Sequence, residues 1–303
     1  MPDYPLVLER LLNTPLLAHP EKAEIVAAVV LRRQGVSVTV AAHAEFVEAP
    51  KAGPLQERRL LERAGDTPYL FDPSTGIAVI GIQGSLAHRQ GYIGRSSGVM
   101  GYDGISAQFD AAVASTAVRA VILDFHTAGG EVHGAFQLAD RIAAARGKKR
   151  LVAMVDEMAY SAGYLLAAAC DEIWLASDTA GVGSIGVVVV HLSFEKMLAA
   201  EGVKPTIIVD GDYKADGNPY EDLPADARAR IQAKVDFVGA EFRTRVAAWR
   251  RLKPEAVAAM KASTFLGPAA LAARLADGIA DPMDVFDALA AELGAPRTPL
   301  FTV

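Results

Sequence analysis

Apolar residues fall into short runs whose spacing alternates between two periods along the middle of the chain. Continuous runs rich in Val, Ile and Leu predict strands at 77–86, 118–125, 150–158, 172–177, 184–190 and 204–211. Apolar positions at helical spacing predict helices at 105–116, 136–147, 161–170 and 194–202. This alternation indicates βαβ units with right-handed crossovers, so we expect an α/β fold with a mostly parallel sheet.

The two ends of the chain have a different pattern. Residues 1–64 look helix-rich, and the turn-rich stretch 65–76 is the candidate boundary. From Pro224 onward the pattern predicts helices only. We therefore expect a helix-rich appendage at 1–70, a main domain at 77–293 with a helical C-terminal region, and a tail at 294–303.

Composition excludes several classes of protein. The chain has 303 residues, of which 51% are hydrophobic, so it can bury a large core. A formal net charge of -6 gives no general footprint for nucleic acid, and the single cysteine, Cys170, reads as a small core residue. No apolar run approaches the roughly 20 residues of a membrane-spanning helix, and no secretory signal is evident. These features predict a cytoplasmic protein without a membrane span.

Two cofactor classes lack support in the sequence. The segment GVGSIG at 181–186 satisfies G-x-G-x-x-G, but it leads into the apolar run VVVV rather than opening a helix. The six histidines are scattered and form no metal-binding spacing. We expect neither a nucleotide nor a metal nor any other cofactor.

The segment AYSAG at 159–163 places a hydroxyl where a strand gives way to a helix. Ser161 resembles the serine of a nucleophile elbow, and the N–H of Ala162 at the helix start suits an oxyanion. The segment HTAGGEV at 126–132 follows another strand, where paired glycines allow close backbone approach. If both loops leave the same sheet edge, Gly129 or Gly130 supplies a second N–H donor.

The residues alone leave the base for Ser161 open. His191, with an aspartate such as Asp171, would make a Ser-His-Asp arrangement. Lys214, in the turn-rich stretch 210–224, is the other candidate. A lysine acts as a base only when its amine is neutral, which requires burial or nearby positive charge.

A resemblance narrows this choice. The segments SAGYLLAAACDEIWL, GVGSIGVVVVH and YKADGNPYEDLP resemble the signal peptide peptidase A family of Ser-Lys proteases, and within it the head maturation proteases of tailed phages. The resemblance runs from about residue 77 to 289. It implies the spiral βαβ fold shared by Clp protease and crotonase. The loop HTAGG departs from the usual Asn-Ser-Pro-Gly-Gly, and Ala162 stands where glycine is common.

Carried over by position, the resemblance implies a serine endopeptidase. Its nucleophile falls on Ser161, its general base on Lys214, the hydroxyl that orients the lysine on Ser184, and its oxyanion hole on Gly129, Gly130 and Ala162. It also implies rings or domes of subunits, and cleavage of scaffold, portal or coat protein inside a procapsid, with self-cleavage expected.

Three alternatives stay open at this point. One is cytosolic degradation of peptides by a related protease. The second is a crotonase-type acyl-CoA hydratase or isomerase, in which Glu131 would act as an acid/base group. The third is a non-catalytic capsid assembly protein that retains the fold.

Overall fold

The computed structural model describes residues 15–18, 55, 62–63, 69–89 and 98–294. The strands are β1 (Leu16–Ala18), β2 (Glu62–Arg63), β3 (Leu70–Asp72), β4 (Ile77–Ala87), β5 (Val99–Gly101), β6 (Ala120–Glu131), β7 (Arg150–Tyr160), β8 (Glu172–Leu175), β9 (Gly181–Gly183), β10 (Thr264–Leu266) and β11 (Gly278–Ile279). The helices are α3 (Tyr102–Ala114), α4 (Ala135–Ala144), α5 (Ala162–Ala168), α6 (Glu195–Ala200), α7 (Ala225–Arg250), α8 (Pro254–Ala259), α9 (Gly267–Ala272) and α10 (Pro282–Glu292).

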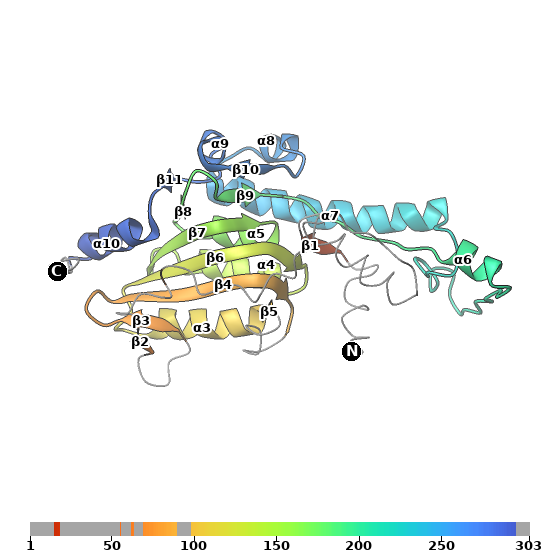
Figure 1. The fold of residues 1–303 in the computed structure, drawn as a ribbon, viewed down its shortest axis with the longest axis horizontal. Coiled ribbons are helices and arrows are strands. Elements are labelled where there is room, and N and C mark those ends of the chain that lie inside the picture. The colour runs from red at the N-terminus through yellow and green to blue at the C-terminus, as the bar shows by residue number, and fades with distance from the viewer. Residues whose placement is uncertain (1–14, 19–54, 56–61, 64–68, 90–97, 295–303) are drawn as a thin grey trace. The chain divides into compact units, whose positions relative to one another are not determined.

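The described strands form a sheet with a parallel centre. Its main path runs β10-β9-β7-β6-β4-β3-β2, and β4, β6 and β7 lie side by side in Figure 1. These three strands are parallel to one another, whereas β3 and β10 pair antiparallel at the two sides. Their apolar runs are buried almost continuously, as parallel strands covered on both faces require. The expected α/β fold with a mostly parallel sheet is confirmed.

Strand β7 divides the sheet into two branches. Its first half, Val152–Val155, pairs with β8, and its last residues, Met158–Tyr160, pair with β9. One face of β4, β6 and β7 carries alternate apolar side chains that pack with Leu55 and with α10. Helix α5 packs against β6 and β7. Strands β6 and β7 are therefore packed against both α10 and α5.

Some sequence predictions are wrong in detail. The run 184–190 is not a strand, because it meets a partner only at Val188 among the described residues. The run 204–211 belongs to no ladder in the described part of the chain, and a strand requires hydrogen-bonded neighbours. The C-terminal region is not wholly helical, because β10 pairs with β9 and β11 with β8.

The chain forms two compact units. The larger consists of residues 17–19, 45–186 and 242–303, and the smaller of residues 1–16, 20–44 and 187–241. Most of the helix-rich appendage expected at 1–70 lies outside the described residues, as does the tail at 294–303 except for Gly294. The predicted domain boundaries therefore stay a prediction. None of the described helices combines the length and apolarity that crossing a bilayer needs.

Candidate active site

Ser161 lies in the turn between β7 and α5, as the sequence predicts. Its backbone has φ 54° and ψ -114°, a conformation that is disfavoured for a residue with a side chain and costs on the order of 1–3 kcal/mol. Two hydrogen bonds hold it there: its N–H donates to the Gly183 carbonyl at 2.9 Å, and its carbonyl accepts from the Leu165 N–H at 3.0 Å. Strain of this kind occurs at nucleophile elbows.

Gly129, in the expected oxyanion loop, touches the Ser161 turn. A Cβ added to Gly129 would lie 2.9 Å from Ser161 Cβ and 3.1 Å from the Ala162 nitrogen. Gly129 also has φ +102°, which favours glycine. The structure thus brings together the serine, the first N–H of α5 and the glycine loop, which the sequence placed on two separate strands.

The glycine loop is part of β6 rather than a free loop. Ser85 and Leu86 of β4 pair with Gly129 and Gly130, beyond a register shift after Gln83. A Cβ on Gly130 would lie 1.9 Å from the Leu86 carbonyl oxygen, so no larger residue fits there. Pairing with β4 therefore fixes the position of both glycines relative to the sheet.

Thr127 braces this loop, a role that the sequence analysis missed. Its hydroxyl donates to the Gly84 carbonyl at 2.5 Å and accepts from the Gly129 N–H at 3.1 Å, and the whole side chain is buried. Its methyl group faces α5, because a Cβ on Gly163 would lie 2.4 Å from Thr127 Cγ2. A hydroxyl two residues before a glycine is the spacing of a local side-chain turn, which was the available signal.

Ser184 lies beside the nucleophile turn. Tyr160 of β7 pairs with Gly183 of β9, and Ser161 and Ser184 are the residues that follow this pair. Ser184 is buried and, like Ser161, has a positive φ, 55°. Its N–H donates to the Ser263 carbonyl at 2.9 Å. The two serines that the sequence analysis selected therefore end neighbouring parallel strands.

Lys214 lies in the smaller unit, and its pairing with Ser161 stays a prediction. Its side chain is exposed, on a turn closed by the Lys214 N–H donating to the Gly211 carbonyl at 3.1 Å. Arg230 of α7 holds this turn on both sides of the lysine: it donates to the two carboxylate oxygens of Asp216 at 2.6 and 2.8 Å, and it lies 4.0 Å from the centre of the Tyr213 ring. The hydrogen bond from Arg230 lowers the pKa of Asp216.

Asp171 is not placed to assist a triad. Its carboxylate accepts a hydrogen bond from the Leu151 N–H at 2.9 Å, at the amino end of β7. Ser161 follows the carboxyl end of the same strand. His191 lies in the smaller unit, so its relation to Ser161 is also untested.

Glu131, the acid/base group of the crotonase alternative, has structural contacts. Its carboxylate accepts from the His88 N–H at 2.7 Å, and its carbonyl accepts from the Tyr102 hydroxyl at 2.8 Å. Burial, with a smaller contribution from the Glu131 charge, raises the pKa of Tyr102 well above its usual value. These contacts tie the end of β6 to α3.

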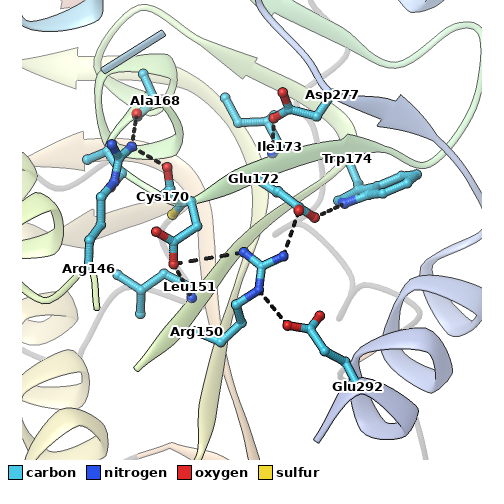
Figure 2. A network of polar contacts seen from close by, with 12 residues as sticks. Arg146, Arg150, Leu151, Ala168, Cys170, Glu172, Ile173, Trp174, Asp277 and Glu292 are labelled. Atoms are coloured by element: carbon cyan, nitrogen blue, oxygen red, sulfur yellow. Dashed lines mark hydrogen bonds and ion pairs between the residues drawn. The ribbon is translucent and has the colours of Figure 1, made fainter. Parts of the chain in front are cut away.

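The far end of α5 is held by arginine. Arg146 donates to the carbonyls of Ala168 and Cys170 (Figure 2) and to that of Ala169, and the bonds to Ala168 and Ala169 are both 2.7 Å long. These are the carbonyls that the end of a helix leaves unpaired, and a cation there also suits the helix dipole. Cys170 is buried, which raises the pKa of its thiol and makes it a core residue.

A cluster of ionisable side chains lies on β6 and β7, a few residues before Gly129 and Ser161. His126 Nε2 is 3.5 Å from a Glu157 carboxylate oxygen. Burial raises the pKa of the neighbouring Asp156, and His126 partly opposes this effect. Among the described residues, no three His, Cys, Asp or Glu side chains are gathered closely enough to hold a metal ion.

Comparison with known proteins identifies the relatives of this chain. A sequence profile for "Peptidase family S49" matches residues 143–295. The chain is 36% identical to the "Head-tail preconnector protein GP5" of Enterobacteria phage P21, over 93% of this chain and 56% of that protein. It is 32% identical to the "Capsid assembly protease C" of Escherichia phage lambda, over 98% of this chain and 68% of that protein.

The chain therefore spans only about half to two thirds of the length of these two relatives. Among solved structures, a mutant of the "1510-N membrane-bound stomatin-specific protease" is similar, with a TM-score of 0.43 and 15% identity over 73% of this chain and 90% of that one.

Proposed function

Because this chain belongs to peptidase family S49, we propose that it is a serine endopeptidase whose nucleophile is Ser161. The observation that carries the proposal is the convergence of three groups: the strained Ser161, the Ala162 N–H and the glycine loop at Gly129. Acyl transfer needs a nucleophile next to backbone donors that can hold an oxyanion, and this turn provides both.

The proposed reaction proceeds through an acyl-enzyme. Ser161 Oγ forms a bond to the carbonyl carbon of a peptide while Lys214 Nζ, in its neutral form, accepts the hydroxyl proton. The carbonyl oxygen becomes an oxyanion, which the Ala162 N–H stabilises. The C–N bond then breaks as Lys214 returns the proton to the leaving amine, and water hydrolyses the ester by the reverse sequence.

A second donor completes the proposed oxyanion hole. The Gly129 N–H already donates to Thr127 Oγ1, which favours the Gly130 N–H as the partner of Ala162. Removing one such donor typically lowers the rate by 10²–10³-fold, which corresponds to about 3–4 kcal/mol. Thr127 acts here as a positioning residue, because it holds the glycine loop without touching the substrate.

Lys214 needs a dry environment to carry out this role. Its side chain is exposed in the single chain, and burial away from water favours the neutral amine. We therefore propose that the active form is a homo-oligomer in which a neighbouring protomer covers the turn that carries Lys214, with Ser184 orienting the amine. Arg230 keeps that turn in place through Tyr213 and Asp216.

The proposed biological role is head maturation in a tailed phage or prophage. It is supported by the two phage relatives, of which one is a capsid assembly protease. The substrates would be scaffold, portal or coat proteins of an immature capsid in the host cytoplasm. No cofactor enters the proposed mechanism.

The test is cleavage of candidate capsid and scaffold proteins by the purified chain, with fragments mapped by mass spectrometry. Ser161→Ala and Lys214→Ala should each abolish cleavage and leave folding and assembly intact. The control Lys204→Ala removes another exposed lysine of the same unit and should leave cleavage unchanged. Full activity of the Lys214 variant would refute the dyad, and full activity of the Ser161 variant would refute the proposed nucleophile.

A further inference from the structure

Strand β1 is a short apolar strand from the N-terminal part of the chain that pairs with β6. Its sequence is Leu-Leu-Ala, and both leucines are buried, Leu17 completely. The Leu16 N–H and carbonyl both bond to Val188, at 2.9 and 3.0 Å. The strand is therefore held by backbone pairing and by burial of its side chains.

The Leu17 carbonyl lies at the candidate active site. A Cβ added to Gly129 would lie 2.2 Å from the Leu17 carbonyl oxygen, on the same side as Ser161 Cβ and the Ala162 nitrogen. Both distances are measured from the same position, the Cβ added to Gly129. The Leu17 carbonyl oxygen and Ser161 Cβ are therefore no further apart than the sum of 2.2 and 2.9 Å. A peptide carbonyl beside the nucleophile and the N–H of the helix start is the arrangement that a substrate requires.

The nucleophile itself is closed off. Ser161 Oγ has almost no accessible surface and no hydrogen-bond partner among the described residues. An extended peptide binds a protease by adding a strand to an exposed sheet edge, with backbone bonds for affinity and pockets for alternate side chains. In the described arrangement that edge of β6 is already taken by β1.

We propose that β1 is a resident occupant of the peptide-binding edge of β6, and that it keeps Ser161 inaccessible until it is displaced. The same contact points to the substrate class: an extended peptide that pairs with β6 and carries an apolar side chain in the place of Leu17. The claim that β1 blocks catalysis by Ser161 rests on the proposed function. The claim that β1 occupies the edge of β6 rests on the contacts of Leu17 alone.

The competition between β1 and a substrate can be estimated. A segment tethered to its own site acts at an effective concentration on the order of millimolar. A peptide added to the intact chain must exceed that concentration to compete. Weakening the pairing of β1 leaves the edge of β6 vacant in a larger fraction of chains. The apparent affinity for an added peptide rises in proportion to that fraction.

The binding test uses a fluorescent peptide with the sequence of residues 13–20 and the full chain carrying Ser161→Ala, so that the peptide stays intact. Leu17→Asp places a charge at a fully buried position, and Leu17→Ala is a milder second variant in case the first does not fold. Leu55→Ala is the matched control, because Leu55 is equally buried but packs with α10. Circular dichroism checks folding in each case.

We expect the Leu17 variants to bind the peptide at least about tenfold more tightly than the parent chain and the Leu55 control. A peptide with Asp in place of the second leucine should not bind. If a folded Leu17 variant binds no better than the parent, the inference is overturned.

Reactivity of Ser161 is measured separately, in chains that retain the serine, with a serine-reactive phosphonate. Faster labelling of the Leu17 variants than of the unchanged chain supports closure by β1, and equal rates overturn it. Absence of labelling in every chain, together with peptide binding by the Leu17 variants, counts against the proposed function and leaves the occupancy of the β6 edge supported.

Discussion

Replacing Thr127 by valine tests whether the glycine loop depends on a side-chain brace. Valine keeps the shape and the methyl group but removes the hydroxyl, which donates to the Gly84 carbonyl and accepts from the Gly129 N–H. A buried polar group left without a partner costs about 1–3 kcal/mol. Gly84 is only half-buried and recovers part of its bond from water, so we expect the free energy of unfolding to fall by about 2–4 kcal/mol.

The matched control is Thr127→Ser, which keeps the hydroxyl and loses only the methyl group beside Gly163. Removing one buried methyl should cost about 1 kcal/mol. Urea denaturation measures both changes, and phosphonate labelling of Ser161 reports whether the glycine loop still supports the nucleophile. We expect the valine variant to be labelled at least about tenfold more slowly than the serine variant. A valine variant as stable and as reactive as the serine variant would refute the brace.

The remaining predictions concern the two ends of α5 and the neighbouring charged group. Gly163→Ala should destabilise the protein by about 1–3 kcal/mol in urea denaturation, because the new Cβ meets Thr127 Cγ2; adding Thr127→Ser should recover part of the loss, and strict additivity would contradict the contact. Arg146→Met should lower the free energy of unfolding by about 2–3 kcal/mol, because it uncaps the end of α5, and an unchanged urea midpoint would count against this cap. Burial raises the pKa of Asp156 above its unfolded value, so the folded state holds that proton more tightly and stability falls as the pH rises through the folded pKa. Asp156→Asn should therefore raise the melting temperature at neutral pH, with a difference that shrinks toward about pH 4; a lower melting temperature at neutral pH would contradict this reasoning.

The elements near the nucleophile could be read from local sequence. Ser161 follows a continuous apolar run and precedes small apolar residues, and the structure places it between β7 and α5 as expected. Gly129 and Ala162, the expected oxyanion donors, lie against the serine, and their catalytic role stays a prediction. The predicted strand, turn and helix are confirmed, because their signals depend on residues close together in the chain.

The same local signals failed where a strand needed a partner. The run 184–190 has the composition of a strand, yet it makes only an isolated bridge at Val188 in the described part of the chain. Conversely, HTAGG looked like a loop and is the end of β6, because β4 supplies partners for Gly129 and Gly130. Strand pairing is a property of two segments, so the composition of one segment does not decide it.

The sequence by itself determined the central strands β4, β6 and β7, the helices α3, α4 and α5, and the positions of the serine, the glycine pair and the helix start, since these follow from apolar spacing and turn chemistry within short windows. Only the tertiary structure decided that Thr127 braces the glycine loop through Gly84, and that Leu17 brings its carbonyl to Gly129. Contacts between residues so far apart in the chain form because sheet pairing and burial bring distant backbone groups together, and no local pattern records which groups will meet.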